Sequence, residues 1–477
     1  MTDRAFSVDD FYELTRLTEL TVSPDGERVA FTIRETNLDD DSFHTSLFVV
    51  PADGSRSPHR LTRASEAGSP VWSPDGTRLG FLATREDLVF ELDSVDDEDD
   101  EEESGTGLES PTQVWAFDLA RGGDARQLTD FEEGVREFDW GPTGERIVVS
   151  ARDPTDEERE TLRKRREEKG PIEIERLQHK ADGQGYLDSV TTYLFIVDVD
   201  SRETQRLDDA YGQGAAEPQS GLQPAWGPDI IAFRTYRGDD PETTYAQDAY
   251  TISPDGGDAE RLTDGGLSVT GFRWSPDGTK LAFAGSDPEN VYKPTETFVA
   301  DRNGGYHSVS ASLDRTLAWA GTPEWADGDT LVAPIGDEGL TRLVRLRADT
   351  DEPERIFDSQ GRHRTVTSFD LAGGTVALGL SAPADGIDVY AAPVEALVTD
   401  DTDALTRLTA LNDDLLSGVS LPTCERVQFT NEDGDEIEGL AYLPDDFNPT
   451  NPDSRPLIAS IHGGPTAYDA PGFDFNY

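Results

Sequence analysis

Short apolar runs recur between residues 20 and 410, and a polar turn precedes most of them. The runs that follow the turns lie at 28–32, 79–83, 147–150, 230–234, 281–284 and 330–333. Further runs lie between the turns, at 46–50, 113–118 and 193–199. They are rich in Val, Ile, Leu and Phe and too short for typical globular helices, so they predict β-strands.

The turns share a Ser-Pro-Asp-Gly motif, which stands at 23–26, 73–76 and 275–278. Proline presets φ for the turn, aspartate bonds neighbouring backbone groups, and glycine takes the positive φ that closes it. Degenerate versions begin at Trp140, Trp226 and Trp325. A second motif closes most units: Arg-Leu-Thr at 60–62, 261–263 and 407–409, Gln-Leu-Thr at 127–129, and Arg-Leu at 206–207.

The repeats start at 22, 72, 140, 226, 274 and 325, and a seventh that lacks the turn motif fits at 369–380. Units of four short strands at this spacing build a β-propeller. We therefore predict a mainly β protein with a seven-bladed β-propeller at 20–412, after an N-terminal segment at 1–19. A further Ser-Pro-Asp-Gly at 253–256 is interpreted as an outer hairpin. If it were a unit start, the count would be eight. The tryptophans at unit starts are expected in the blade core.

Two intervals between successive repeat starts, from 72 to 140 and from 140 to 226, are longer than the others and indicate insertions near 91–110 and 153–185. The first contains an unbroken acidic run at 96–103, and self-repulsion of like charges predicts a solvated loop there. This run lacks the spaced ligands of a calcium loop. The second is dense in Glu, Arg and Lys at 153–169 and predicts a solvent-exposed helix.

A different pattern follows the repeats. Apolar runs at 427–430 and 437–443 flank a turn at 431–434, which predicts a β-hairpin. A proline-rich connection then leads to an apolar strand at 457–461 that runs into His462-Gly463-Gly464-Pro465. An α/β-hydrolase presents a backbone N–H to an oxyanion from such a loop. We therefore interpret 424–477 as the first strands of an incomplete, truncated α/β-hydrolase domain.

Charge narrows the choice of environment and partners. The 477 residues include 97 acidic and 41 basic ones, a net charge of −56, and lysine is scarce among the bases. This balance favours a protein that works in concentrated salt, where screening weakens self-repulsion. Nucleic acid is an unsuitable partner because phosphate binding needs a basic face. The start lacks a signal-peptide core and no stretch approaches a membrane span, so we expect no membrane association and a cytoplasmic location in a high-salt cytosol.

The cysteine and histidine residues indicate neither a disulfide nor a metal site. Cys424 is the only cysteine, so no disulfide can form within the chain, and we expect a structural thiol. The histidines before His462 show no metal-ligand spacing, so we expect neither a metal nor a cofactor. They are His44, His59, His179, His307 and His363.

The chain resembles the prolyl oligopeptidase (S9) family of serine peptidases, with most likeness to its acylaminoacyl-peptidase branch. The resemblance rests on the Ser-Pro-Asp-Gly propeller, on Asp-Gly-Gln-Gly-Tyr-Leu-Asp at 182–188, and on 439–477 with its His-Gly-Gly-Pro loop. It implies a propeller that caps an α/β-hydrolase domain and admits short peptides, which a serine attacks with help from histidine and aspartate. It also implies an oxyanion-hole loop made of His462, Gly463, Gly464 and Pro465, with the backbone N–H of Gly464 as donor.

The catalytic triad that the family implies is not found within residues 1–477. No Gly-x-Ser-x-Gly occurs, and the nearest strings, around Ser268, Ser381 and Ser420, lack the second glycine. In this fold the catalytic histidine follows the nucleophile, so we expect His462 to shape the loop instead of acting as the base. We therefore expect nucleophile, acid and base beyond Tyr477, and an inactive chain.

Two alternatives stay open. Glu132-Glu133 and Glu167-Glu168 could hold a peptide amine, as paired glutamates do in the related dipeptidyl-peptidases, although solvated surface is the preferred interpretation. The second hypothesis for the whole chain is a non-catalytic propeller that binds peptides or proteins. Against it, such a module has little reason to keep 457–461, whose exposed edge would pair with other chains. The sequence leaves acylaminoacyl-peptidase and dipeptidyl-peptidase activity, and the oligomeric state, undecided.

Overall fold

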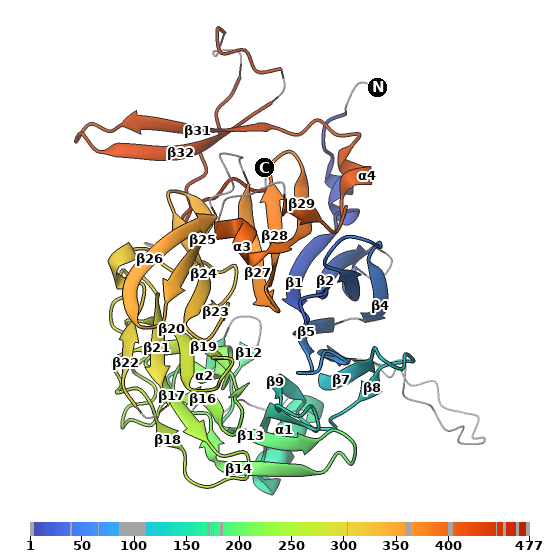
Figure 1. Ribbon diagram of the computed structural model, residues 1–477, viewed down its shortest axis with the longest axis vertical. Helices are drawn as coiled ribbons and strands as arrows, with labels where there is room; N and C mark the ends of the chain where they lie inside the picture. Colours follow the sequence, from blue (N-terminus) through green and yellow to red (C-terminus); the bar gives the residue numbers. More distant parts are fainter. Residues whose placement is uncertain are drawn as a thin grey trace.

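Seven four-stranded antiparallel sheets stand in a ring and follow one another along the chain (Figure 1). The computed structural model describes residues 4–38, 41–64, 66–84, 111–168, 172, 174, 176–181, 185–302, 304–357, 364–398, 404–444, 446–451, 455–463 and 467–473. The predicted seven-bladed propeller is confirmed. The motif at 253–256 is an outer hairpin between β17 (Asp248–Ile252) and β18 (Glu260–Arg261), as interpreted. The acidic run at 96–103 lies outside the described residues.

The strands of each blade run in order from the centre of the ring to its rim (Figure 1). Blades 1 and 2 contain β1 (Arg16–Val22), β2 (Arg28–Asn37), β3 (Ser42–Pro51), β4 (His59–Ala64), β5 (Glu66–Trp72), β6 (Arg78–Thr84), β7 (Gln113–Asp118) and β8 (Arg126–Gln127). Blades 3 and 4 contain β9 (Val135–Trp140), β10 (Arg146–Arg152), β13 (Thr192–Asp198), β14 (Thr204–Tyr211), β15 (Ala225–Trp226), β16 (Ile231–Thr235), β17 and β18. Blades 5 to 7 contain β19 (Ser268–Trp274), β20 (Lys280–Ser286), β21 (Glu296–Asp301), β22 (Tyr306–Ser308), β23 (Glu324–Trp325), β24 (Thr330–Asp337), β25 (Leu340–Arg347), β26 (Thr350–Phe357), β27 (Thr365–Ala372), β28 (Thr375–Ala382), β29 (Gly386–Pro393) and β30 (Thr406–Arg407).

The apolar run after each turn is the second strand of its blade. This strand lies between two others and is covered on both faces by neighbouring blades, so nearly all its positions are apolar. Val29, Ile147, Leu281 and Val376, each near the start of such a strand, have no exposed surface. The continuous apolar pattern in the sequence therefore reflects burial on both sides of the strand.

The Ser-Pro-Asp-Gly turns join the first strand of a blade to the second. In blade 1, Gly26 takes φ +73° and donates its N–H to the carbonyl of Ser23 at 2.7 Å. The Asp25 carboxylate accepts the Ser23 hydroxyl at 2.5 Å. A Cβ on Gly26 would stand 2.8 Å from the carbonyl oxygen of Gly373 in blade 7, so this turn requires glycine both for its φ and for the close approach.

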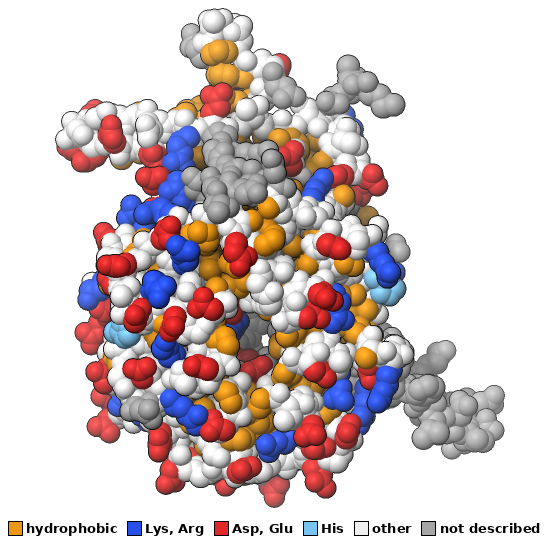
Figure 2. All heavy atoms as spheres, viewed as in Figure 1, with side chains coloured by type: hydrophobic (Ala, Val, Ile, Leu, Met, Phe, Trp, Pro, Cys, Tyr) orange, Lys and Arg blue, Asp and Glu red, His pale blue; other side chains and the backbone are white. Residues whose placement is uncertain are grey.

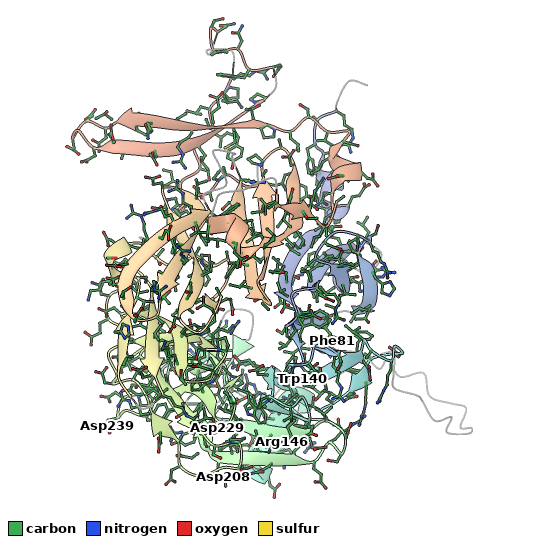
Figure 3. All side chains as sticks on the ribbon, in the orientation of Figure 1. Phe81, Trp140, Arg146, Asp208, Asp229 and Asp239 are labelled. Atoms are coloured by element: carbon green, nitrogen blue, oxygen red, sulfur yellow. The ribbon has the colours of Figure 1, made fainter. Side chains whose placement is uncertain are left out.

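Tryptophans at the ends of first strands join neighbouring blades. The Trp140 indole donates to the carbonyl of Val71 in blade 2 at 3.0 Å, and the Trp325 indole donates to the carbonyl of Arg273 in blade 5 at 2.9 Å. Figure 3 shows Trp140 near Phe81 of blade 2. Both tryptophans are buried, so each ring fills the boundary between blades while its N–H keeps a partner.

Blades 1 and 7 meet without sharing a strand, since every blade is built from its own stretch of chain. Side chains close the seam instead. The Asp370 carboxylate accepts the backbone N–H of Val22 at 2.6 Å, and the Asn412 side chain makes two 2.9 Å hydrogen bonds to the backbone of Thr15. Apolar side chains of both blades also form one buried cluster across the seam.

The connections between strands leave the ring on two different faces, because neighbouring strands are antiparallel. We call one of them the docking face; it carries the connections between second and third strands and the connections between blades. The insertion in blade 3 lies there, with α1 (Asp156–Glu168), β11 (Lys180–Ala181) and β12 (Gly185–Tyr186). The predicted helix at 153–169 is thus confirmed.

The docking face also holds the exposed large apolar side chains of the propeller. Among the described residues, all of them lie on or next to its connections: Leu38, Phe43, Ile172, Ile174, Leu177, Tyr186, Tyr245, Val291, Tyr292 and Trp319. The turns of the opposite face expose none of this kind within the described ranges. The two faces of the ring therefore differ in chemistry.

The chain continues after the propeller into a hairpin of β31 (Thr423–Thr430) and β32 (Glu436–Leu443), which lies beyond blade 7 in Figure 1 and matches the predicted hairpin. The predicted strand at 457–461 is wrong: this stretch has no regular structure, and Leu457 and Ile461 are 92% and 89% exposed. A strand needs hydrogen-bonding neighbours, and the described residues supply none beside it. The remaining short helices are η1 (Val8–Tyr12), α2 (Glu217–Ser220), η2 (Ala311–Leu313), α3 (Val394–Val398) and α4 (Asp413–Leu416).

Candidate active-site region on the docking face

The predicted oxyanion loop lies in the segment that follows the hairpin. His462 and Gly463 are exposed and belong to no helix or strand. Gly464 and Pro465 lie outside the described residues. The described part of this loop contacts no partner that would make His462 a catalytic base, and its assignment as an oxyanion loop stays a prediction.

The residues just after the loop contact the propeller. The hydroxyl groups of Tyr468 and Thr341 are 3.1 Å apart, and Thr341 belongs to β25 of blade 6. The backbone N–H of Phe473 donates to the hydroxyl of Ser381 on β28 of blade 7 at 2.8 Å. Ser381, one of the serines in an incomplete nucleophile motif, is therefore a buried hydrogen-bond acceptor. Sequence reasoning missed Thr341 and Tyr468, because no local motif marks a contact between residues so distant in the chain.

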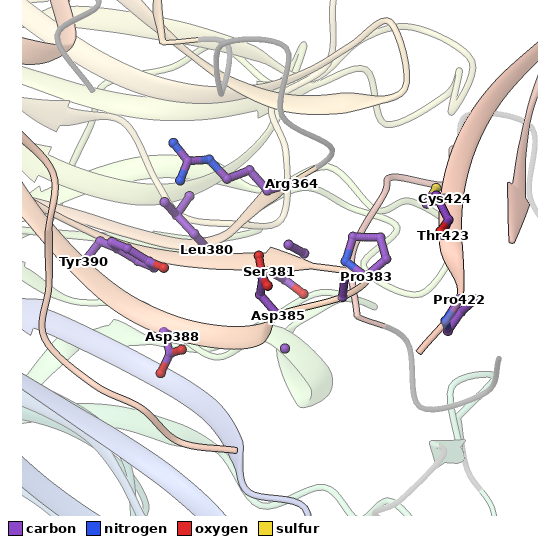
Figure 4. A pocket seen from close by; sticks show the side chains of 13 residues that line it. Arg364, Leu380, Ser381, Pro383, Asp385, Asp388, Tyr390, Pro422, Thr423 and Cys424 are labelled. Carbon is purple, nitrogen blue, oxygen red and sulfur yellow. The ribbon is translucent and has the colours of Figure 1, made fainter. Parts of the chain in front are cut away.

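A cavity of about 500 Å³ lies beside Ser381, between blade 7 and the start of the hairpin strand β31 (Figure 4). Arg364, Ser381 and Tyr390 line it on the blade side, and Pro422 and Cys424 line it on the other. Burial raises the pKa of the Cys424 thiol, so the thiol stays protonated and is a poor nucleophile. This agrees with a structural role for the cysteine.

Charged side chains of the first strands meet at the centre of the ring, where Figure 2 shows the surface hollowed. Arg273 of blade 5 interacts electrostatically with Glu324 of blade 6, Asp370 of blade 7 and Asp139 of blade 3. Its guanidinium donates to Glu324 at 2.6 Å. Carboxyl groups from three other blades thus act on one guanidinium near the centre of the ring.

Burial raises the pKa of these carboxyl groups. The pKa of Asp139 rises to about 6, even though its carboxylate accepts the backbone N–H groups of Trp226 and Trp140 at 2.7 and 2.8 Å. The pKa of Glu324 rises to about 7 because burial outweighs the nearby Arg273 guanidinium. These groups change charge near neutral pH, whereas exposed carboxyl groups do so near pH 4.

Of the two glutamate pairs considered for binding a peptide amine, Glu132 and Glu133 form ion pairs with arginines of this chain. Glu133 accepts two arginines, Arg152 at 3.2 Å and Arg166 at 2.8 Å, and its side chain is only 4% exposed. Glu132 pairs with Arg159 of α1 at 2.7 Å. The preferred interpretation as solvated surface is therefore wrong for Glu133, because the pair holds α1 against blade 3. Glu167 and Glu168 end α1, and their side chains lie outside the described set.

In the described ranges, no group of three or more His, Cys, Asp or Glu side chains is placed to hold a metal ion. His363 lies outside those ranges. No helix among the described residues is long and apolar enough to cross a membrane.

Known proteins share this architecture. No family profile matches the chain. Among curated proteins it is similar to the uncharacterized peptidase YuxL of Bacillus subtilis, with 24% identity across 97% of this chain and 67% of that protein. It is also similar to a probable dipeptidyl-peptidase 5 of Aspergillus niger, with 30% identity across 40% of this chain and 25% of that protein.

Solved structures give the same result for the fold. The acylaminoacyl peptidase of Pyrococcus horikoshii superposes with a TM-score of 0.71 at 16% identity, covering 98% of this chain and 63% of that one. The β-propeller domain of the trilobed protease from Pyrococcus furiosus, described as an open velcro topology, has a TM-score of 0.55 at 16% identity, with 84% and 98% covered. The chain spans about two thirds of the length of the first of these relatives in each comparison.

The fold is a seven-bladed β-propeller that superposes on these solved structures. The motifs, the similarity to these peptidases and the fold agree with the predicted resemblance to the prolyl oligopeptidase (S9) family.

Proposed function

We propose that this chain is part of a serine peptidase of the S9 type that hydrolyses short peptides, with acylaminoacyl-peptidase or dipeptidyl-peptidase specificity. The similarity to a peptidase across 97% of the chain carries the proposal, because a match of that extent includes the propeller and part of the segment after it. The contacts of Tyr468 and Phe473 with blades 6 and 7 support it, since these residues follow the predicted oxyanion loop closely in the chain.

The parts of the chain have separate roles in this proposal. The propeller, predicted at 20–412 after an N-terminal segment at 1–19, begins with β1 at Arg16 and admits short peptides, and residues 424–477 open the peptidase domain. The loop of His462, Gly463, Gly464 and Pro465 stabilises the oxyanion, and the Gly464 N–H is the donor; one such donor contributes about 3–4 kcal/mol to the transition state. Nucleophile, acid and base are supplied from outside residues 1–477, so this chain alone is inactive.

We also propose that the protein works in a high-salt cytosol. Acidic side chains are exposed on the propeller: Asp208 on the rim strand β14, and Asp229 and Asp239 on connections between strands of blade 4 (Figure 3). With a net charge of −56, such a surface repels itself unless salt screens it.

A fluorophosphonate probe for active serines tests the proposed peptidase. We would label an extract of the source organism in high salt and identify the labelled proteins by mass spectrometry. We expect peptides of this chain in a labelled species well above 52.2 kDa. If its peptides occur only in an unlabelled species near 52.2 kDa, the peptidase proposal fails and the binding-module hypothesis is favoured. The purified chain should not react with the probe.

A further inference from the structure

An open pocket of about 250 Å³ lies on the docking face between blades 5 and 6. Its walls come from three connections of the propeller: 292–294 in blade 5, 314–316 between the blades, and 336–339 in blade 6. Tyr468 lines the pocket as well, and its ring packs over Gly336, where a Cβ would stand 2.5 Å from a ring carbon. The pocket is therefore built from segments that lie far apart in the chain.

Hydrogen bonds hold the three connections together. The Leu317 N–H donates to the carbonyl of Thr295 at 2.9 Å, and the Gly336 N–H donates to the carbonyl of Thr316 at 3.0 Å. The Thr316 hydroxyl accepts the Thr295 N–H at 3.2 Å. The walls are thus fixed without a ligand, which lowers the entropic cost of binding one.

Two neighbouring residues of the pocket carry opposite charges and do not pair with each other. Arg315 donates its Nε to the Asp337 carboxylate at 2.7 Å and its Nη1 to the backbone carbonyl of Asp314 at 2.8 Å. In the part of the chain that the structure describes, no hydrogen bond engages the Nη2 of Arg315 or the carboxylate of Asp314. The guanidinium is held in place and keeps donors for an anion, while the carboxylate keeps acceptors for a cation.

The buried partner of Arg315 does not cancel its charge. Asp337 also pairs with Arg342 at 2.8 Å and with Arg355 at 2.6 Å, and Glu338 on the same turn lies 3.1 Å from Arg342. Two carboxylates thus face three guanidiniums. Although burial raises the pKa of Asp337, hydrogen bonds from these arginines outweigh burial and hold that pKa well below its usual range. Asp337 therefore stays ionised and keeps Arg315 in position.

The rest of the pocket offers apolar surface. Tyr292, which is 71% exposed, lines it together with Pro294 and Tyr468. A cavity of about 150 Å³ can hold one benzene molecule, so a pocket of about 250 Å³ has room for a side chain of that size and a short charged backbone. Aromatic walls favour contact with an apolar or aromatic group.

We propose that this pocket binds a free α-amino acid with an apolar side chain. Arg315 binds the carboxylate, Asp314 binds the ammonium group, and Tyr292 and Tyr468 pack against the side chain. A peptidase that acts on short peptides releases such molecules, so the site goes beyond the proposed function by adding a place for a product. Binding itself needs no peptidase activity.

Saturation-transfer difference NMR on the purified chain, at constant KCl, measures the binding of L-phenylalanine. Two blocked probes separate the charges, because N-acetyl-L-phenylalanine lacks the ammonium group and L-phenylalanine amide lacks the carboxylate. Each should bind about fivefold more weakly than L-phenylalanine, the factor that matches the loss of one net hydrogen bond.

Two variants assign the roles. Asp314→Asn removes a charge at φ +50°, a left-handed conformation that asparagine also adopts, so the backbone is kept. This variant should bind L-phenylalanine about fivefold more weakly and should bind the N-acetyl probe as the wild type does. Arg315→Gln should weaken L-phenylalanine by a similar factor and leave the affinity for the amide unchanged.

Arg302→Gln is the matched control. Arg302 pairs with Asp229 at 2.7 Å and lies outside the pocket, and its side chain is 37% exposed, against 39% for Arg315. This variant should bind all three probes as the wild type does.

Equal affinity for L-phenylalanine and both blocked probes, or no saturation transfer, would overturn the proposal. The same holds if Arg302→Gln weakens binding as much as Arg315→Gln. The fluorophosphonate experiment stays separate: if no species reacts with that probe, the peptidase proposal fails, and amino-acid binding to the purified chain is still decided by the NMR titrations.

Discussion

Replacement of Asp139 by asparagine tests whether the centre of the ring holds a buried charge that costs stability at neutral pH. Burial raises the pKa of this carboxyl from 3.8 to about 6. A raised folded-state pKa means that the protonated form is favoured by folding. The resulting stability is fully present below pH 3.8 and is lost as the pH rises through 6.

The size of the effect follows from the same two values. At about 1.4 kcal/mol per pKa unit, ionisation of Asp139 lowers the free energy of unfolding by at most about 3 kcal/mol, and channel water reduces this figure. Asparagine carries no charge at any pH and escapes this loss. Its amide nitrogen faces one of two N–H donors that the carboxylate accepted, which adds a cost of about 1–3 kcal/mol that does not depend on pH.

Urea unfolding at a series of pH values, in constant molar KCl, measures the difference. From about pH 4 to pH 7, the free energy of unfolding of Asp139→Asn minus that of the wild type should increase by roughly 2–3 kcal/mol. Salt should not remove this gain, because it screens buried groups poorly. The control is Asp277→Asn. Hydrogen bonds, first from Ser275 and then from Thr279, lower the pKa of Asp277 to about 2, so its contribution is lost only in more acidic solution.

Parallel pH curves for Asp139→Asn and the wild type would refute the reasoning. They would mean that the Asp139 carboxylate titrates like an exposed one. The reasoning would also be contradicted if the pH curves of Asp277→Asn and the wild type separated by the same amount between pH 4 and pH 7. The effect would then be general to carboxyl groups of this protein.

Three further predictions concern the ring as a whole. The melting temperature should rise steadily as KCl is raised from millimolar to molar concentration, and a flat or falling curve would contradict the salt adaptation. Trp140→Phe should lower the free energy of unfolding by about 2 kcal/mol, because the carbonyl of Val71 in blade 2 loses its hydrogen bond from the indole. Trp319→Phe, at a fully exposed ring, should lower it by less than about 0.5 kcal/mol. Gly26→Ala should cost more than about 2 kcal/mol and Gly122→Ala only about 1 kcal/mol: both glycines have positive φ, but only the first touches another blade. Equal costs within either pair would show that the contacts between blades do not matter.

Local chemistry explains which parts of the fold could be predicted. The turn at 23–26 and its repeats fix a hairpin by the conformational preferences of proline, aspartate and glycine, and the apolar runs fix the second strands. The turn motif marked six units, and the spacing left room for a seventh that lacks the motif, which the structure places at 365–407. These signals are all contained within a few residues of the chain.

The rest depends on contacts that no local pattern reveals. Glu133 and Arg166 meet over a distance of 33 residues, and Ser381 meets Phe473 over 92. The strand expected at 457–461 illustrates the opposite error. Its apolar pattern is that of a central strand, but a strand forms only where neighbours complete its hydrogen bonds, and the described residues provide no such neighbours.

The seam between blades 1 and 7 closes the ring without a strand shared by the two ends of the propeller. Each blade is one uninterrupted stretch, and the first and last blades are held by side chains, much as blades within the ring are held to one another. A circular permutant that links residue 412 to residue 15, which keeps the seam contacts, and opens the chain at another connection between blades should assemble the same ring.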